Sequence, residues 1–286
     1  MILDDKRKFP YLLIFPATIF LLLLIIYPML DLLKLVFFKP EFPFITFKNI
    51  INLFKYFSLL NQSLISIIHV TISTIGTVIF GLLISYLIYR ITRFKTIYHI
   101  VFLLPLALPP IVAANTWKMA LDPTRGIFNY ILNLLGFSAI SWFSSPKLAL
   151  ISVIGVAIWR WVPLAVLIFY AGFEQVPKSY LEAASVDGAN EWQKFNNILL
   201  PLLKPFIIIV TFLEFIMCFR EFAIIYGMTR GGPSQATETF VLRAYKEALQ
   251  WGNFVPGAVI SVIILVVGLV VTRYGYNLLV NYQKNI

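Results

Sequence analysis

The sequence contains few charged residues and few residues that bind metals or form disulfides. Asp, Glu, Lys and Arg make up 13% of its 286 residues, whereas soluble domains have about 25%. Cys218 is the sole cysteine and lies in an apolar segment, so no intrachain disulfide can form. His69 and His99 have no ligand-like neighbours, and no Gly-x4-Gly-Lys-Ser/Thr segment occurs. These absences exclude an intrachain disulfide framework, a metal site of known motif and a P-loop nucleotide site.

Apolar residues, in contrast, are abundant: 60% of the chain is hydrophobic. Several apolar runs exceed the length of about 18 residues that indicates a transmembrane helix. We therefore expect an all-α membrane protein with one transmembrane domain over residues 1–286 and six transmembrane helices. The spans are predicted at about 11–33, 63–88, 97–120, 148–172, 202–226 and 255–277. The first run is longer than the apolar region of a signal peptide, about 7–15 residues, so we expect it to be retained.

The net charge of +10 is carried mostly by short loops, where Lys and Arg orient helices and contact anionic lipid headgroups. This distribution argues against nucleic acid as a partner. Basic residues at 6–8, and Arg90, Arg93 and Lys95 in the second loop, favour both termini in the cytoplasm. Four lysines oppose this arrangement, because they fall on the other side: Lys34, Lys39, Lys48 and Lys55. Charge alone leaves the orientation open.

Prolines are expected to interrupt two of the spans. Pro105, Pro109 and Pro110 interrupt the third, and Pro163 breaks the fourth. In lipid, such breaks persist only where other groups satisfy the freed carbonyls. We expect the Pro109–Pro110 pair to border a cavity; plain kinking in a packed bundle is the alternative.

Two stretches outside the spans have the i, i+3, i+4, i+7 apolar spacing of an amphipathic helix. They are Ile50, Leu53, Phe54 and Phe57, and then Ile127, Tyr130, Ile131 and Leu134. Both are predicted to be short helices that lie in the membrane interface.

Between the fourth and fifth spans the sequence is polar, over residues 174–204. Pro177 suits the start of a helix because its missing N–H needs no partner there. Gly188 favours the left-handed turn that ends this helix. Asn190 and Gln193 form a capping-box pattern for a second helix, which Pro201 closes. The segment predicts a rigid helix-turn-helix that docks a partner, or else a solvated hairpin that covers the base of the bundle.

The spacing within this hairpin resembles the EAA loop of ABC-importer permeases. Three residues separate Glu182-Ala183-Ala184 from Gly188, and nine separate Gly188 from Ile198-Leu199-Leu200-Pro201. The resemblance implies that the loop faces the cytosol and couples to a separate ATPase, and this settles the predicted orientation. The residues implied in coupling are Glu182, Ala183, Ala184, Asp187, Gly188, Ile198, Leu200 and Pro201.

Two further segments resemble carbohydrate-type permeases of the maltose/glycerol-3-phosphate family. One is Thr229-Arg230-Gly231-Gly232-Pro233, which looks like the family's Thr-x-Gly-Gly-Pro segment, although Arg230 stands where a smaller residue is frequent. The other is Trp117 followed by Asp122-Pro123, Gly126 and Asn129. The resemblance implies that Gly231, Gly232 and Pro233 lie outside the cytoplasm.

The family resemblance also implies the partners and the cellular location. They are a second homologous permease in a heterodimer, two cytosolic ABC ATPase subunits and an extracytoplasmic solute-binding protein. The complex would import a sugar, polyol or glycerol phosphate across the cytoplasmic membrane of a prokaryote by alternating access. This chain would bind no cofactor and would not be an enzyme, because ATP and Mg²⁺ are used by the ATPase partner.

Charged residues inside the predicted spans are candidates for the translocation path. Each costs about 2.5–3.5 kcal/mol at a helix centre, so none is expected to face lipid. Glu214 and Glu221 are seven residues apart and would share one helix face, with Arg160 as a candidate partner. The charged candidates are Arg160, Glu214, Arg220 and Glu221, and the sugar-binding candidates are Asn115, Trp117, Trp159 and Trp161. The alternatives are a buried ion pair between helices, and tryptophans in the interfacial belt.

Two other classes of function compete with the importer subunit. A stand-alone secondary transporter predicts coupling ions and more spans or a detectable internal repeat. A membrane enzyme would use Glu214 and Glu221 as acid and base, but neither a nucleophile nor a metal motif accompanies them. The sequence leaves open which sugar or polyol is carried, and whether this subunit or its partner contacts it.

Overall fold

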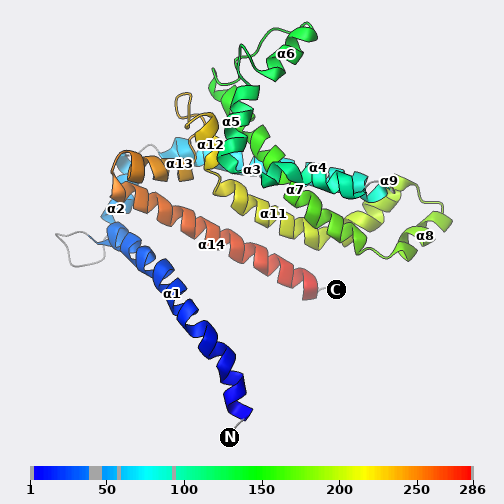
Figure 1. Ribbon diagram of the computed structural model, residues 1–286, viewed down its shortest axis with the longest axis horizontal. Coiled ribbons are helices and arrows are strands. Elements are labelled where there is room, and N and C mark those ends of the chain that lie inside the picture. The colour runs from blue at the N-terminus through cyan, green and yellow to red at the C-terminus, as the bar shows by residue number, and fades with distance from the viewer. Residues whose placement is uncertain (1–2, 39–46, 57–58, 92–94, 285–286) are drawn as a thin grey trace. The chain divides into compact units, whose positions relative to one another are not determined.

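The computed structural model describes residues 3–38, 47–56, 59–91 and 95–284, and in these ranges the chain is helical with connecting loops and no strand (Figure 1). Four helices contain segments long and apolar enough to cross a membrane. They are α1 (Leu3–Phe37), α3 (Leu59–Arg90), α7 (Pro146–Glu174) and α14 (Phe254–Lys284). Two bent helix pairs bring the number of spans to six if each pair is one span. The predicted all-α membrane fold is thus confirmed.

The first bent pair is the predicted third span. It consists of α4 (Lys95–Ala107) and α5 (Pro110–Ala120), which meet at an angle of 102°. Pro109 and Pro110 both lack an N–H, so two consecutive hydrogen bonds of a helix cannot form here. Pro105, in contrast, is accommodated inside α4. The predicted interruption is therefore confirmed for Pro109 and Pro110, and it lies at Leu108–Pro109, whereas the prediction that Pro105 also interrupts the span is wrong.

The second bent pair differs from the predicted fifth span, 202–226. A helical stretch at Glu191–Leu202 is followed by α11 (Lys204–Phe219) at an angle of 67°. α11 ends at Phe219, and α12 (Ala223–Met228) begins separately. The prediction of one helix through residue 226 is wrong: α11 ends with Arg220 at its C-cap, and α12 starts anew after Phe222, where the Glu221 carboxylate accepts a hydrogen bond from the Ile224 N–H at 3.1 Å.

The fourth span shows the opposite outcome. α7 continues through Pro163, so the predicted break at this proline is wrong. Pro163 is buried together with Val162, Ala165 and Val166 on its flanks. A single proline costs one backbone hydrogen bond, and close packing on both sides keeps the helix continuous.

The contacts divide the chain into two compact units, residues 1–59 with 244–265, and residues 60–243 with 266–286. In the first unit, α2 (Lys48–Tyr56) is joined to the end of α1 because the Asn49 side chain donates to the carbonyls of Leu35 and Val36. α2 confirms the helix predicted around Leu53, whereas Phe57 lies outside the described residues. This unit also contains the π-helical turn η2 (Lys246–Gln250), where Glu247 accepts from the Asn253 amide at 3.0 Å. Whether residues 1–286 form a single domain stays a prediction.

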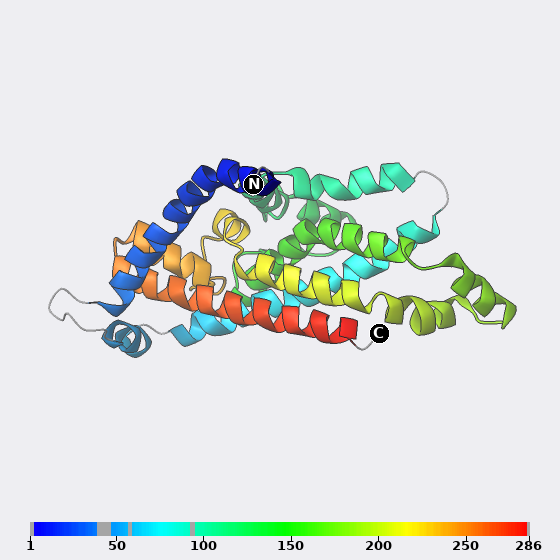
Figure 2. The same cartoon turned by 90° about the horizontal axis from the view of Figure 1, so that it is seen from below.

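The second unit is built around α3, α7 and α11 (Figure 2). Phe169 and Phe173 of α7 are fully buried against Leu203 and Val210, with Tyr86 of α3 packed beside them. α4 packs along α7, and α12 packs against α5. α13 (Phe240–Tyr245) is joined to α3 because the Phe240 N–H donates to the Ser66 hydroxyl at 2.9 Å. This core positions the 174–204 hairpin at one end of α7.

A short helix, α6 (Ile127–Leu134), lies between α5 and α7 and confirms the helix predicted there. Its four predicted apolar residues are all exposed. The segment around it is fixed by polar side chains. Asn129 is buried and bonds Pro123, Ile140 and the Trp142 ring N–H, while Asp122 accepts from Thr124 and Arg125. The Arg125 N–H and then Thr124 hold the pKa of Asp122 below its ordinary value.

Candidate coupling hairpin and translocation path

The hairpin begins with α8 (Lys178–Val186), which has Pro177 at its N-cap and ends in a tight turn. Gly188 has φ of +79°, the left-handed conformation that the sequence predicts. The Gly188 N–H donates to Ser185 and the Ala189 N–H to Ala184, at 3.2 and 2.9 Å. These two bonds form a Schellman motif, which satisfies the last carbonyls of α8 and fixes the direction of the chain.

The second helix of the hairpin starts with the predicted capping box. Asn190 and Gln193 exchange side-chain-to-backbone hydrogen bonds of 2.8 Å at the start of α9 (Glu191–Lys194). A π-helical turn, η1 (Phe195–Leu199), and a short helix, α10 (Leu200–Leu202), follow. The prediction that Pro201 closes the helix is wrong, since the helical stretch passes Pro201 and ends at Leu202. Pro201 lies where the π-helical turn η1 passes into α10, one residue before the stretch ends, and its missing N–H leaves one helix hydrogen bond unmade.

Apolar side chains fix this hairpin to the bundle. Leu199 and Leu203 are buried with Phe173 of α7, and Leu181 and Phe195 pack against the same cluster. The ring of Phe195 lies 4.8 Å from that of Tyr86 in α3, measured between centroids. The base of the hairpin is thus continuous with the core of α3, α7 and α11, which allows a force on its tip to reach these helices.

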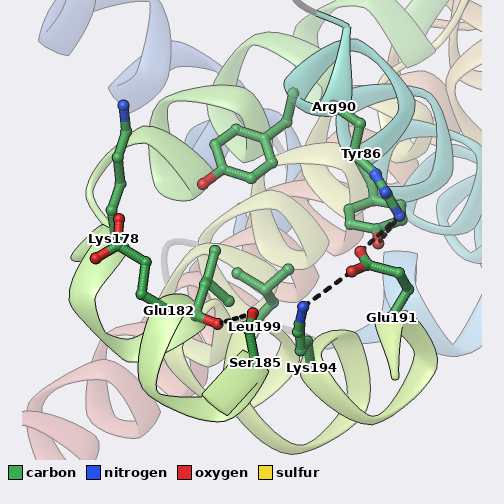
Figure 3. Close-up of a pocket in the computed structure, with 10 residues that line it drawn as sticks. Tyr86, Arg90, Lys178, Glu182, Ser185, Glu191, Lys194 and Leu199 are labelled. Carbon is green, nitrogen blue, oxygen red and sulfur yellow. Dashed lines mark hydrogen bonds and ion pairs between the residues drawn. The ribbon is translucent and has the colours of Figure 1, made fainter. Parts of the chain in front are cut away.

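A cleft of about 330 Å³ separates the end of α3 from the two hairpin helices (Figure 3). It is lined by Tyr86, Tyr89, Arg90, Lys178, Leu181, Glu182, Ser185, Glu191, Lys194 and Leu199. Arg90 forms an ion pair of 2.7 Å with Glu191, which also pairs with Lys194 at 3.0 Å. In the sequence Arg90 serves only as an indicator of orientation. Its pairing with Glu191 was missed because the two residues are far apart along the chain.

The ion pair also sets the protonation of Glu191. Hydrogen bonding to Lys194, and then the nearby Arg90 charge, hold the pKa of Glu191 below its ordinary value of 4.5. A lowered pKa means that the interaction is complete above the ordinary pKa and is lost as the pH falls through the lowered one. The link between α3 and α9 therefore persists throughout the neutral range.

The outer face of the hairpin is exposed and partly apolar. Val186 is 88% exposed and Trp192 is 70% exposed. Of the coupling residues, Glu182, Ala183, Asp187, Gly188 and Pro201 are exposed, while Ala184, Ile198 and Leu200 are half-buried. Within the described part of the chain, the Glu182 carboxylate has no hydrogen bond or ion pair. This face can accept a partner through apolar contacts and one free carboxylate.

Two of the candidate path residues are brought together. The rings of Trp117 on α5 and Trp159 on α7 meet edge to face at 5.3 Å, and Trp117 also stacks on Phe128. Asn115 is exposed on α5, close to Gly227 of α12. The structure thus joins Trp117 and Trp159 in one aromatic cluster, while Asn115, two residues before Trp117 on α5, is near α12 instead.

The structure places Arg160 differently from the sequence prediction. Its Nη1 donates to the carbonyls of Pro105 and Leu108, at 3.2 and 2.9 Å, and no ion pair joins it to Glu214 or Glu221 in the described structure. The predicted partnership is wrong because Pro109 frees carbonyls in the α4–α5 break, and the buried guanidinium satisfies them. The acceptors of Arg160 therefore belong to the backbone and not to a carboxylate.

The predicted shared face of Glu214 and Glu221 is also wrong, because α11 ends between them. Glu214 is fully buried on α11, and its two carboxylate oxygens have no hydrogen-bond donor among the described residues. Glu221 lies beyond the helix end and accepts from the Trp161 ring N–H at 3.3 Å. Arg220 caps α11 and is exposed.

A row of buried polar residues on α3 was missed altogether. Gln62, Ser66, His69, Ser73 and Thr77 are all less than 3% exposed. Their spacing of four, three, four and four residues places them on one helix face, so the sequence carried a signal that could have found them. The first part of this face bonds the segment after α12, where the Gln62 amide donates to Gln235 and Glu238.

The Gly231-Gly232-Pro233 segment forms a turn held by its own side chains. The hydroxyls of Thr229 and Thr237 are 2.6 Å apart, and Thr237 also donates to the Gly232 carbonyl. Gly231, Arg230, Ser234 and Gln235 all have positive φ. Thr-x-Gly-Gly-Pro therefore specifies a compact loop, with Ser234 and Gln235 exposed at its tip. Among the described residues, no three His, Cys, Asp or Glu side chains gather as metal ligands do.

Comparison with known proteins identifies this architecture. Residues 77–280 match the family described as "Binding-protein-dependent transport system inner membrane component". The trehalose/maltose transport system permease protein MalF of Thermococcus litoralis is 31% identical over 91% of this chain and 90% of its own. The sn-glycerol-3-phosphate transport system permease protein UgpA of Agrobacterium fabrum is 32% identical over 77% of this chain and 75% of its own.

A solved structure shows the same fold. A chain of a bacterial ABC transporter involved in the import of the acidic polysaccharide alginate superposes with a TM-score of 0.86, at 20% identity, over 97% of each chain. The family match includes the 174–204 hairpin and confirms the predicted resemblance to ABC-importer permeases. The chain belongs to the inner membrane components of binding-protein-dependent transport systems: it is a multi-pass permease subunit of a prokaryotic ABC importer, a family without catalytic activity of its own.

Proposed function

We propose that this permease carries a sugar, or a related polyol or glycerol phosphate, across the cytoplasmic membrane by ATP-driven alternating access. The observation that carries the proposal is the 174–204 hairpin, which combines a fixed base with an exposed apolar face at the EAA spacing. The printed functions of two relatives, trehalose/maltose and sn-glycerol-3-phosphate transport, support this substrate class. The working complex contains a second permease, two ATPases and a solute-binding protein.

In this proposal the hairpin and both termini face the cytoplasm, and the ATPase binds the face formed by Glu182, Ala183 and Val186. Small side chains at Ala183 and Ala184 permit close approach, while Val186 and Trp192 provide apolar area that is buried on docking. Because Leu199 and Leu203 join the hairpin to the core, closure of the ATPases would move α3, α7 and α11 with it.

The translocation path is proposed to run along the surface of α5 and α7. Trp117 and Trp159 provide an aromatic face, and the exposed Asn115 provides an amide on the side of α5 near α12. Arg160, Glu214, Arg220 and Glu221 surround the broken helices that would rearrange when the path opens. The Gly231-Gly232-Pro233 loop is proposed to lie on the extracytoplasmic side, where a solute-binding protein arrives.

The experiment that tests docking is co-purification of the tagged chain from its native host in mild detergent, with Gly188→Pro as the disrupting variant. Proline fixes φ near −65° and has no N–H, so it cannot adopt the Gly188 conformation or donate to Ser185. We expect the wild-type chain to bring a second permease and an ATPase, and the variant to lose the ATPase.

Gly136→Pro is the matched control. Gly136 ends α6 with φ of +80°, and the Gly136 and Phe137 N–H groups donate to Asn133 and Leu132 in the same Schellman pattern. This variant should therefore suffer equal backbone damage and keep the ATPase. Equal loss in both variants would contradict docking at the hairpin. A wild-type chain that purifies alone or as a homo-oligomer would contradict the importer assembly.

A further inference from the structure

Two adjacent residues of α7 contact the two broken helices of the second unit. Arg160 is buried, and its Nη1 donates to the carbonyls of Pro105 and Leu108 at the break between α4 and α5. Pro109 cannot donate to the Pro105 carbonyl, so the guanidinium replaces a missing helix hydrogen bond. The end of α4 and the break that precedes α5 are thus fixed to this turn of α7.

The next residue makes the corresponding contact to the other break. The Trp161 ring N–H donates to Glu221 Oε2 at 3.3 Å, while Oε1 of the same carboxylate accepts from the Ile224 N–H at 3.1 Å. Glu221 is 6% exposed, so both bonds form away from solvent. The start of α12 is therefore fixed to the same turn of α7 through one carboxylate that has both oxygens occupied.

The two helices that begin at these breaks also pack directly on each other. A Cβ placed on Gly227 of α12 would lie 2.6 Å from the Ala114 Cβ and 3.0 Å from the Ile111 Cδ1 of α5. The Arg160 guanidinium lies over the Trp161 ring, 5.6 Å from its centroid. Arg160 and Trp161 of α7 thus bond the two breaks, and the helices that follow these breaks, α5 and α12, pack on each other.

We propose that Arg160 and Trp161 are positioning residues that join the α4–α5 and α11–α12 breaks, so that α5 and α12 turn together during transport. The inference rests on the proposed function in one respect, which is that ATP binding drives α5 between two states. An isolated salt bridge would stabilise one helix pair, whereas here neighbouring side chains of one helix contact two separate breaks. Without the Trp161 bond, the start of α12 loses its hydrogen-bonded link to α7 and keeps only packing contacts with it, so the two breaks are less tightly coupled.

The test measures the motion of α5 in the intact complex, in membranes of the native host. Met119 on α5 is 75% exposed and the single native cysteine, Cys218, is 1% exposed, so Met119→Cys gives a site for selective maleimide labelling. The labelling rate is compared between the nucleotide-free complex and the complex trapped with ATP and vanadate. Trp161→Phe then removes the N–H donor while most of the ring packing remains.

We expect the labelling rate of Met119→Cys to differ between the two states. Trp161→Phe should reduce the ratio of these two rates about fivefold, because the lost hydrogen bond is to a charged carboxylate and is stronger than a neutral one. Trp142→Phe is the matched control: it loses a ring N–H bond of 3.2 Å to Asn129, outside the two breaks. It should keep the wild-type ratio. Arg160→Met, which retains the aliphatic stem, should also lower the ratio, although this variant can lower the yield of folded protein.

A wild-type ratio for Trp161→Phe would overturn the inference and leave the proposed function intact. Equal reductions in Trp161→Phe and Trp142→Phe would also overturn it, since they would indicate a general loss of stability. If the protein with Met119→Cys as its only substitution were labelled at the same rate in both states, the result would overturn the inference together with the proposed ATP-driven movement of α5.

Discussion

Gly81 of α3 lies so close to α7 that any side chain at this position would meet Ala165. A Cβ on Gly81 would be 2.5 Å from the Ala165 Cβ and 3.5 Å from its Cα. Helices in a membrane are held by close van der Waals packing, which small residues permit. The contact joins the helix that carries Tyr86 and Arg90 to the helix that carries Arg160 and Trp161, so it fixes both the base of the hairpin and the broken helices.

We therefore expect Gly81→Ala to lower the stability of the detergent-solubilised chain by about 1–3 kcal/mol, as overpacking does in other cores. The measurement is the apparent melting temperature, followed by size-exclusion chromatography after heating. Adding Ala165→Gly removes the atom that the new methyl meets and should restore much of the loss. Gly155→Ala is the control, because a Cβ there meets nothing within 4 Å. An equal loss for Gly81→Ala and Gly155→Ala would contradict this packing.

At the scale of the helices, the hairpin is attached to α3 in two ways. Apolar side chains pack at its base, and an ion-pair network lies outside that base. Arg90, at the last position of α3, pairs with Glu191, at the first position of α9. Both side chains are about half exposed, and exposed pairs contribute roughly 0.2–1 kcal/mol. We therefore infer that this ion pair orients the hairpin relative to α3, whereas the buried Leu199 and Leu203 stabilise its attachment to the core.

Reversing either charge should reduce substrate uptake about two- to fivefold, the range that such a small free energy allows, while the ATPase still co-purifies. The variants are Arg90→Glu and Glu191→Arg. Combining both reverses the pair and should recover part of the uptake, although the arginine introduced by Glu191→Arg would then repel Lys194. Lys194→Gln is the control, since it leaves the link between α3 and α9 in place. Uptake in the double variant as low as in the poorer single variant would contradict the role of this pair.

The parts of the hairpin that could be predicted from sequence are those with local causes. Gly188 and the Asn190–Gln193 pair act on backbone groups a few residues away, so their conformations follow from residue type and spacing. The break at Pro109 is predictable for the same reason, because two missing N–H groups are a local property.

The parts that could not be predicted depend on residues far away in sequence. Pro163 is a helix breaker by local preference, yet close packing keeps α7 continuous. By its apolar surroundings Glu221 belongs to one long helix, and only the structure shows that Trp161, sixty residues earlier, and Ile224 occupy its two oxygens. Arg160 was predicted to pair with a carboxylate because backbone carbonyls freed elsewhere cannot be recognised in a residue pattern. Long-range contacts thus decide where this chain bends.

For the whole molecule, the remaining question is how many times the chain crosses the membrane. Four helices qualify as spans by themselves, and each bent pair is either a broken span or a re-entrant loop. The two possibilities differ in which connecting segments share a side. If both bent pairs cross, the end of α3 and the hairpin face one side, whereas the segment after α6 and the Gly231-Gly232-Pro233 loop face the other.

Single cysteines labelled with a membrane-impermeant maleimide distinguish these arrangements, and the buried Cys218 makes the unmodified chain a low-background control. We expect Ile91→Cys and Val186→Cys to react only in inside-out vesicles, and Phe137→Cys and Ser234→Cys only in right-side-out vesicles or cells. If Ile91→Cys reacted from the same side as Phe137→Cys, the α4–α5 pair would be a re-entrant loop. If Ser234→Cys were labelled from the same side as Val186→Cys, the bent pair that ends in α11 would be a re-entrant loop. Reversal of all four would place the hairpin outside, where no cytosolic ATPase can reach it, and would contradict the proposed coupling.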